Sequence, residues 1–404
     1  MLPENKRAFN FCNITEWHKQ GYTGKGIKIA IGDSRFHLSD RVIQNFNGKL
    51  QSGTIRLDAS QPESSHGSRT AHVIHQIAPD AELYMTSGFG PCVRWATRNE
   101  MDLFNISMRI FIPSTGRYNI LLNEYTEKGG VMFASAGNNG EEHGLGIPAE
   151  MKDCIAVAAA DLGRNNAVSR TWYSSFTTEY LEYLEQMVEV TGITNLIVKE
   201  HDGSPRRFGG TSCACPFITG MAALVAQRYK EQGHKLTIDQ FRKYKQEHVM
   251  DLETPGFNRQ TGYGLLRLGR PQDLVLPKFS EINMWIDKDV MTIDGKEVKM
   301  DVAPIAISGR TMVPIRFIAE AFGAEVDWVQ ATRTVVIKTK DGKELNLWIG
   351  KYEMSVNGET QEIDVAPIAV ANRTLVPLRF IAEALGAEVD WVQNTGTVVI
   401  RKFI

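Results

Sequence analysis

Up to about residue 270, short apolar runs alternate with segments whose apolar positions recur at helical spacing. Apolar runs of this length are typical of strands covered on both faces, and apolar residues three and four positions apart are typical of helices with one buried side. The predicted strands are Ile27–Ile31, Glu82–Thr86, Leu103–Ser107, Val131–Ser135 and Cys154–Ala160, and the predicted helices are Asn13–Gln20 (with Asn13 as N-cap), Arg69–Ile77, Val93–Asn99 and Tyr118–Lys128. This alternation predicts an α/β fold, a parallel sheet with helices on both faces and right-handed crossovers.

The pattern is less regular between residues 161 and 209. We predict an insertion or long loop there, with one helix over Thr177–Val188. The apolar run Phe217–Val225 then predicts a buried helix, and Thr237–His248 a charged one. Pro271 and Pro277 bracket a linker, so the first domain is predicted to span residues 1–275.

The remainder of the chain is an internal repeat. Asp301–Ile305 recurs 63 residues later as Asp364–Ile368. Each copy predicts strands, then a helix through RFIAEAFGA or RFIAEALGA, then the strand TVVIKT or TVVIRK. We predict one α+β domain over residues 276–404, with repeats at about 283–340 and 345–404, because each repeat alone is too small to bury a core. Other matching pairs are Arg310 and Arg373, Pro314 and Pro377, Arg316 and Arg379, Phe317 and Phe380, Gly323 and Gly386, and Trp328 and Trp391.

Composition narrows the class of protein. The 404 residues are 43% hydrophobic and 23% charged, with a formal net charge of −2, which is typical of a globular protein without a surface for nucleic acid or anionic membranes. No run is apolar and long enough to span a bilayer. The first residues contain no apolar signal-peptide core, which favours cytoplasmic synthesis.

The candidate chemistry begins at Gly210–Pro216, a turn of small residues that leads directly into the apolar run. This arrangement predicts Ser212 at a helix N-terminus, where the helix dipole favours developing negative charge, and Pro216 in the first helical turn. An ordinary serine N-cap is the alternative. A nucleophilic serine needs a base and a carboxylate that orients the base. Asp33, just past a predicted strand, and His66, at the start of a predicted helix, meet this requirement if the loops converge.

The five cysteines are scattered and contain no CxxC pair, so neither a disulfide framework nor a zinc site is predicted. Cys213 and Cys215 flank Ser212, and a cysteine protease is therefore an alternative. We predict instead that the cysteines are small buried apolar residues.

The flanking sequences resemble the subtilisin-like serine proteases, the subtilases, over roughly residues 13–270. The segments that resemble this family, in its order, are IKIAIGD, SHGSRTAHVI, APDAELY, WATRNEMDLFNIS, VMFASAGNNG, GGTSCACP and GYGLL. The resemblance implies a subtilisin-like fold in which Asp33 orients, His66 is the general base and Ser212 is the nucleophile. It implies an oxyanion hole formed by Asn138 and the backbone amide of Ser212, no cofactor for catalysis, and a structural calcium site that the sequence does not locate. The implied substrate-binding residues are Ser107, Met108, Arg109, Ala136 and Gly137.

The chain departs from the family pattern in three places: Ser34-Arg35 replaces Thr-Gly, Arg69–His72 replaces His-Val-Ala-Gly, and Ser107–Ile110 replaces Ser-Leu-Gly-Gly. Arg109 takes the place of a glycine beside the substrate backbone. Because guanidinium groups pair with carboxylates, this predicts a preference for Asp or Glu shortly before the scissile bond. The alternative is that Arg109 faces solvent or pairs with an acid such as Asp102.

The repeats resemble a non-catalytic module named after the N-terminal domain of copper amine oxidases, found in pairs on firmicute surface and secreted proteins. Residues 271–404 contain no His or Cys, so the ligands that copper prefers are missing. The resemblance implies attachment to a cell-wall or protein ligand, and an exterior location as the alternative to a cytoplasmic one. The four paired tryptophans can stack on a sugar-like ligand, but as paired repeat positions we predict them to be core: Trp285, Trp328, Trp348 and Trp391.

The main prediction is a serine endopeptidase that acts on proteins or peptides through an acyl-enzyme and has a C-terminal binding module. Two alternatives remain: a pseudoprotease that binds peptides without cleavage, and a surface-binding protein whose function lies in the repeats.

Overall fold

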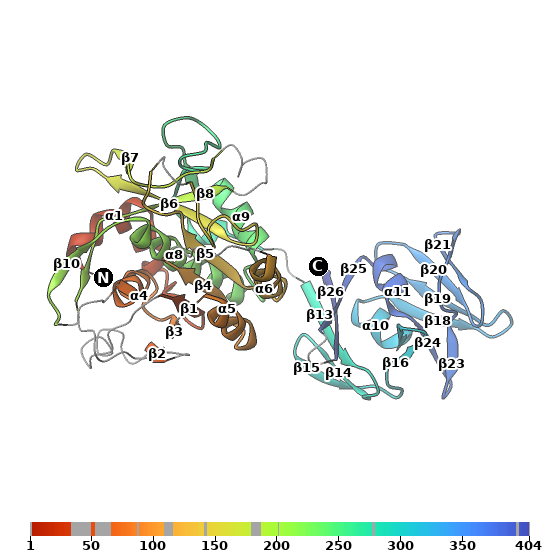
Figure 1. Ribbon diagram of the computed structural model, residues 1–404. Helices are drawn as coiled ribbons and strands as arrows, with labels where there is room; N and C mark the ends of the chain where they lie inside the picture. The colour runs from red at the N-terminus through yellow and green to blue at the C-terminus, as the bar shows by residue number, and fades with distance from the viewer. Residues whose placement is uncertain are drawn as a thin grey trace. The chain divides into compact units, whose positions relative to one another are not determined.

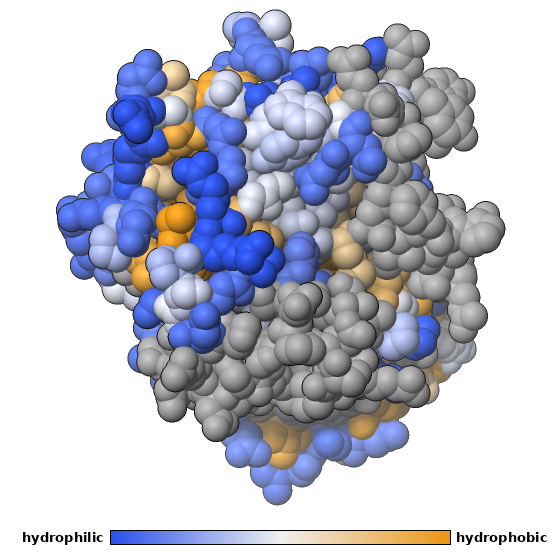
Figure 2. Space-filling model, turned by 60° about the vertical axis from the view of Figure 1, so that its left-hand side comes forward, coloured by the Kyte–Doolittle hydropathy of each residue, from blue (hydrophilic) through white to orange (hydrophobic). Residues whose placement is uncertain are grey.

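The computed structural model describes residues 2–33, 50–52, 66–86, 89–108, 116–140, 144–178, 187–200, 202–276, 279–392 and 396–403. The chain divides into two compact units, Met1–Leu276 and Pro277–Ile404 (Figure 1). Among the described residues, no helix combines the length and apolar character needed to cross a bilayer. On the face shown in Figure 2, the described residues are mostly hydrophilic and the hydrophobic ones form small separate areas.

The first unit is built on a mainly parallel sheet with the strand order β11-β12-β8-β6-β5-β4-β1-β3-β2. Strand β1 pairs in parallel with β3 on one side and with β4 on the other, so the chain order reverses at β1. Its strands are β1 Lys28–Gly32, β2 Leu50–Ser52, β3 Glu82–Thr86, β4 Leu103–Ile106, β5 Val131–Ser135, β6 Ile155–Leu162, β8 Val188–Ile193, the short β11 Val249–Met250 and β12 Leu265–Leu266, and β7 Val168–Arg170 on β6.

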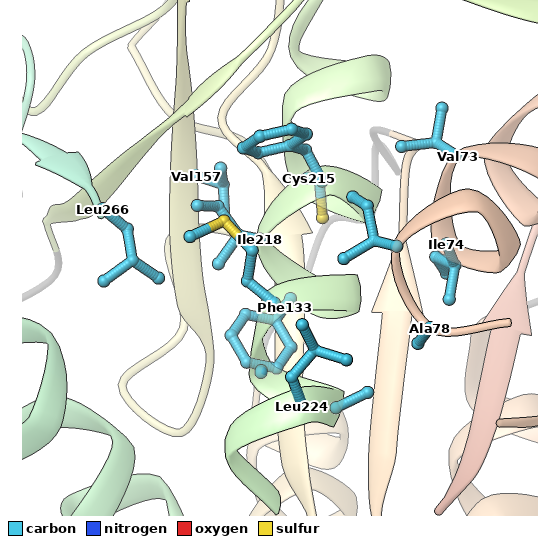
Figure 3. Close-up of a cluster of buried hydrophobic side chains, with 14 of the residues drawn as sticks. Val73, Ile74, Ala78, Phe133, Val157, Cys215, Ile218, Leu224 and Leu266 are labelled. Atoms are coloured by element: carbon cyan, nitrogen blue, oxygen red, sulfur yellow. The ribbon is translucent and has the colours of Figure 1, made fainter. Parts of the chain in front are cut away.

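Helices cover both faces of this sheet, as the sequence predicts. Side chains alternate along β1: Ile29 and Ile31 join the core under α8, whereas Ala30 joins a second core under α5 and α6. Figure 3 shows the first core, where side chains from α4, α8 and strands β5 and β6 meet. The helices are η1 Pro3–Asn5, α1 Lys6–Phe11, α2 Ile14–Lys19, α4 His66–Ile77, α5 Phe89–Arg98, α6 Gly116–Glu127, α8 Thr211–Glu231, α9 Ile238–Glu247 and η2 Pro271–Asp273.

The prediction of an irregular insertion over residues 161–209 is wrong. This stretch contains β7 and β8 together with a hairpin of β9 Leu196–Lys199 and β10 Pro205–Phe208. The predicted helix Thr177–Val188 falls largely outside the described residues, and its described ends are not helical, since Val188 begins β8. In the hairpin, a short apolar run in β9 is followed by exposed charged residues in β10, so the pattern of a buried strand does not continue.

Asn13 is the N-cap residue of α2, as predicted, although its side chain does not cap the helix. Asn13 precedes α2 with a left-handed φ of 62°, and its side chain makes no cap hydrogen bond. Its amide group donates to the Leu268 carbonyl oxygen at 2.5 Å, which ties the N-terminal helices to the end of the unit.

Within its described residues, the second unit contains three antiparallel sheets, and each combines strands from both repeats. One five-stranded sheet joins the first three strands of repeat one to the last two of repeat two, and the other joins the last two of repeat one to the first three of repeat two. The strands and helices are β13 Phe279–Trp285, β14 Val290–Ile293, β15 Lys296–Lys299, β16 Ile305–Ile307, β17 Arg310–Pro314, α10 Ile315–Ala321, β18 Glu325–Val329, β19 Thr334–Lys338, β20 Glu344–Trp348, β21 Glu353–Val356, β22 Glu359–Glu362, β23 Ile368–Val370, β24 Arg373–Pro377, α11 Leu378–Ala384, β25 Ala387–Val392 and β26 Thr397–Phe403.

The four repeat tryptophans differ in burial, and the core prediction is wrong for two of them. Trp285 and Trp348 are half-buried, with a lysine ammonium over each ring. Trp328 and Trp391 are 40% and 53% exposed. The tryptophans at equivalent positions thus have similar burial, but repetition of a position does not place its side chain in the core.

Candidate active site

The candidate residues gather at the carboxyl edge of β1, β4 and β5. Asp33 directly follows β1, Ser107 follows β4, and Asn138 lies in the turn after β5. Because these neighbouring strands are parallel, their carboxyl ends lie side by side. The reversal of strand order at β1 makes this edge the place where open α/β sheets bind their ligands.

A hydrogen bond joins Asp33 to His66. His66 is the first residue of α4, and its Nδ1 lies 2.8 Å from Asp33 Oδ2. The Asp33 side chain is 1% exposed and that of His66 32%. A buried carboxylate next to Nδ1 favours the tautomer with its proton on that nitrogen, which leaves Nε2 free to accept. Thr70 directs its hydroxyl at the same carboxylate oxygen from 3.5 Å.

Ser212 is the second residue of α8, and Gly210 rather than Ser212 is the N-cap residue. Gly210 has φ 80°, and a Cβ there would lie only 3.1 Å from the Asn138 amide, so both the backbone and the space favour glycine. The Ser212 hydroxyl donates to the Ser107 carbonyl oxygen at 3.2 Å. The serine N-cap alternative is thus excluded.

Pro216 lies inside α8, one turn beyond the predicted first turn. Proline has no N–H to donate to the carbonyl of the residue four positions earlier, which here is Ser212. The prediction of Pro216 in the first turn is therefore wrong.

Asn138 is bound to the first turn of α8. Its side-chain oxygen accepts from the backbone N–H of Thr211 at 2.9 Å and from the Thr211 hydroxyl at 3.0 Å. Thr211 Oγ1 also accepts from the Gly137 N–H at 3.2 Å. The Asn138 oxygen is thereby held by two donors of Thr211, the residue directly before Ser212.

The described substrate-binding candidates line the same edge. Ser107 is buried, Met108 is half-buried, and Ala136 donates its N–H to Val157 O. Gly137 has φ 110°, and a Cβ there would lie 3.0 Å from the Ser175 hydroxyl oxygen. Arg109 lies outside the described residues.

An ion-pair cluster ties α4 to the β9–β10 hairpin, a link that the sequence did not predict. Arg69 Nε and Nη2 both lie 2.8 Å from Glu200 Oε1, and Arg206 Nε lies 3.3 Å from the same atom. The Lys199 N–H donates to His72 Nδ1 at 2.7 Å, and burial lowers the pKa of His72 to about 3. We call Arg69, Glu200 and Arg206 the hairpin cluster.

This hairpin ends directly before the turn to Ser212. Phe208, its last residue, contacts the His66 ring edge-on, with centroids 5.4 Å apart. The hairpin cluster therefore connects the helix that begins with His66 to the segment that leads into Ser212. Arg69 and Glu200 are 131 positions apart, so no local sequence pattern predicts that they pair. The only related signal in the sequence is the departure from the family pattern at Arg69–His72.

The two cysteines beside Ser212 are unsuited to nucleophilic attack. Both are buried; burial raises the pKa of Cys213 to about 12 and that of Cys215 further. Their thiols stay protonated near neutral pH, which argues against the cysteine protease alternative. All five cysteines are buried and free. Within the described ranges, no group of three metal-ligating side chains is found.

Comparisons with known proteins agree with this geometry. The model of the subtilase family matches residues 24–264. The chain belongs to the subtilase family. The model of the copper amine oxidase N-terminal domain matches residues 281–400. These matches confirm both resemblances that the sequence suggested.

Similar subtilases include two from Bacillus. Minor extracellular protease Epr of Bacillus subtilis (strain 168) is 28% identical over 269 residues, which cover 62% of this chain and 39% of Epr. Subtilisin NAT of Bacillus subtilis subsp. natto is 29% identical over 235 residues, which cover 52% of this chain and 58% of NAT. The chain thus spans only about two fifths to three fifths of these relatives.

Solved structures confirm the subtilisin-like fold. The prenylagaramide maturation protease PagA aligns with a TM-score of 0.53 at 17% identity, over 64% of this chain and 98% of PagA. A lanthipeptide protease aligns with a TM-score of 0.54 at 19% identity, over 68% of this chain and 96% of that protein.

Proposed function

We propose that this subtilase is an active serine endopeptidase with Asp33, His66 and Ser212 as its catalytic residues. The observation that supports this best is the 2.8 Å hydrogen bond between the buried Asp33 and His66, on the same sheet edge as Ser212. In the proposed first step, Ser212 Oγ attacks the scissile carbonyl carbon and its proton moves to His66 Nε2. Asp33 stabilises the imidazolium that forms, and His66 passes this proton to the leaving amine. Water then attacks the acyl-enzyme with His66 as base, which releases the carboxylic acid and restores Ser212.

Two donors are proposed for the oxyanion. The first is the Asn138 NH2 group, and the second is the Ser212 N–H, which lies in the first helical turn, where amides have no partner within the helix. Both lie at the positive end of the α8 dipole. The proposed chemistry uses no cofactor.

Attack requires Ser212 to exchange its hydrogen bond to Ser107 O for one to His66, by rotation about its Cα–Cβ bond. We propose that the substrate backbone lies along Ser107, Met108 and Arg109 on one side and along Ala136 and Gly137 on the other. A substrate N–H that bonds to Ser107 O releases the Ser212 hydroxyl. The preference for acidic residues that Arg109 implies stays a prediction.

Fluorophosphonate labelling tests the proposal. The wild-type chain should form an adduct on Ser212 and cleave casein, whereas Ser212→Ala should do neither while keeping its thermal melting profile. His66→Ala should be comparably inactive, because residues that act as a unit do not contribute additively. A folded wild-type chain that takes no label and cleaves no casein would favour the pseudoprotease.

The second unit is proposed as a non-catalytic binding module, since every candidate catalytic residue lies in the first unit. A cell-wall or protein ligand is the class expected of it. Epr is named as an extracellular protease, which favours an exterior location for this chain.

A further inference from the structure

The second unit contains a cavity of about 550 Å³ between its two repeats. The β16–β17 hairpin of repeat one contributes one wall, and α11 with β25 and β26 of repeat two contributes the other. This volume falls within the range of about 300–1,000 Å³ that is usual for ligand pockets. Because both repeats line it, the cavity forms only when they fold together.

Most of the cavity lining is apolar. Ile286, Leu378, Phe380, Val389 and Val398 contribute aliphatic and aromatic surface. Trp391 also lines it and is 53% exposed, so much of its indole surface remains available for contact. An apolar or aromatic group of a ligand fits this lining.

Of the charged groups that line the cavity, three are already paired. Arg310 Nε lies 2.6 Å from Asp364 Oδ2, across the two repeats. Asp390 Oδ2 lies 2.9 Å from Arg401 Nη1. Few lining polar groups are therefore left for the many hydroxyls of a sugar.

Arg379 is the exception: its guanidinium has no hydrogen-bond or ion-pair partner in the described part of the chain. The equivalent residue of repeat one, Arg316, faces Glu320 at 3.7 Å. Arg379 has Glu383 at the same spacing, but these two side chains form no such pair. The cavity thus offers one uncompensated positive charge beside an apolar surface, and guanidinium groups match carboxylates in a bidentate manner.

We propose that this cavity binds the carboxyl end of peptides whose last residue is aromatic or branched apolar. The terminal carboxylate pairs with Arg379, and the last side chain packs against Trp391 and the apolar lining. An endopeptidase creates a new peptide carboxyl end at each cleavage. The source of the ligand therefore rests on the proposed function, whereas its chemistry is inferred from the cavity lining alone.

Calorimetric titration of the full-length Ser212→Ala chain tests the inference without cleavage. The probes are N-acetyl-Ala-Ala-Phe with a free carboxylate and the same peptide as its C-terminal amide. We expect the acid to bind at least about tenfold more tightly than the amide, because the loss of a charge-assisted hydrogen bond usually lowers affinity by at least this factor.

The repeat supplies matched control variants. Added to Ser212→Ala, Arg379→Gln should weaken binding of the acid about tenfold and remove its advantage over the amide, and Trp391→Ala should weaken both peptides. Arg316→Gln and Trp328→Ala, the equivalent changes in repeat one, should leave both affinities unchanged. Peptide that still binds after Arg379→Gln and Trp391→Ala are combined reports binding outside this cavity.

Three results would overturn the inference: equal affinity for acid and amide, equal losses from Arg316→Gln and Arg379→Gln, or saturable binding of glucuronic acid or decanoate with none of the peptide acid. Failure of this inference and failure of the proposed function can be told apart. Fluorophosphonate labelling of the wild type tests the reactivity of Ser212, whereas the titration tests the binding of a carboxylate at Arg379.

Discussion

The two units assemble their candidate sites from different kinds of residue. In the first unit, Asp33, His66, Asn138 and Ser212 come from four separate segments and converge at one sheet edge. In the second unit, the residues around the cavity have counterparts 63 positions away, as Arg316 has for Arg379. Two residues at equivalent repeat positions can therefore differ in their capacity to bind a ligand. Arg316 faces Glu320 in an ion pair, whereas the guanidinium of Arg379 has no such partner among the described residues.

After the loss of activity expected of Ser212→Ala and His66→Ala, the next largest effect is expected at Asn138, which has no counterpart in the second unit. Asn138→Ala should lower kcat about 10²–10³-fold with little change in KM, as loss of an oxyanion-hole donor does in subtilisins. Asn139→Ala, the exposed neighbour, is the control and should keep nearly full kcat. A loss below about threefold in Asn138→Ala, measured by steady-state hydrolysis of a peptide substrate, would contradict the assignment.

A smaller effect is expected from the hairpin cluster. Glu200→Gln leaves Arg69 and Arg206 facing each other without the carboxylate, which should loosen the hairpin from α4 and displace His66 slightly. We expect about a tenfold loss of kcat at unchanged KM, since catalysis is sensitive to small misplacements. Neutralising Arg69 as well, in Arg69→Gln with Glu200→Gln, should recover part of the loss.

The first unit offers a matched control for this test. Glu189 is similarly buried and pairs with Arg242 at 2.8 Å and with Lys245 at 3.2 Å, and none of these residues contacts a candidate catalytic residue in the described hydrogen bonds and ion pairs. Glu189→Gln should lower the melting temperature without lowering kcat at the assay temperature. If Glu200→Gln behaves in the same way, the hairpin cluster is only structural.

A pH effect on stability should be confined to the first unit, since residues 277–404 contain no histidine. The folded chain holds His72 neutral, because burial lowers its pKa from 6.5 to about 3. Between these values the unfolded chain binds a proton that the folded chain does not, so stability falls as pH falls below about 6.5. The change is about 1.4 kcal/mol per pH unit for one group.

Urea unfolding at pH 7 and pH 5 measures this effect. His72→Gln removes the titrating group and supplies an oxygen for the Lys199 N–H. The variant should lose about 2 kcal/mol less stability than the wild type between the two pH values. Parallel losses in both proteins would show that other groups, such as His18, whose pKa burial also lowers, determine the acid response.

The smallest effect is expected from removal of the second unit. A chain that ends at Leu276 keeps every candidate catalytic residue and should hydrolyse a small peptide with kcat/KM within about twofold of the full chain, because domains are built on separate cores. A shortened chain that fails to fold, or that loses most of its activity, would show that the two units depend on each other.

The parts of the fold that sequence predicted well are those with local causes. Strands β3 and β5 coincide with the predicted Glu82–Thr86 and Val131–Ser135, because mostly apolar segments between turns mark them. Strand β8 escaped prediction because it includes Glu189, a charged residue buried only through distant Arg242 and Lys245. The hairpin escaped prediction because its apolar residues are confined to β9, and because Glu200, which joins it to α4, pairs with an arginine far away in the sequence.

The same distinction applies to the candidate site. Motifs marked Asp33, His66, Asn138 and Ser212, but no local pattern indicates that Ser212 bonds to Ser107 or that Glu200 lies between two arginines. Likewise, Arg316 and Arg379 lie in nearly identical helices, and only their three-dimensional surroundings separate them.

The exchange of strands in the second unit has a consequence for its synthesis. Its first strand, β13, pairs along its whole length with its last, β26, in a register that places Phe279 opposite Phe403. This sheet cannot close until β26 has left the ribosome, by which time the first unit is already free to fold. A ribosome that stops short of β26 would therefore release a chain with all its candidate catalytic residues and with β13 exposed as an unpaired, aggregation-prone edge.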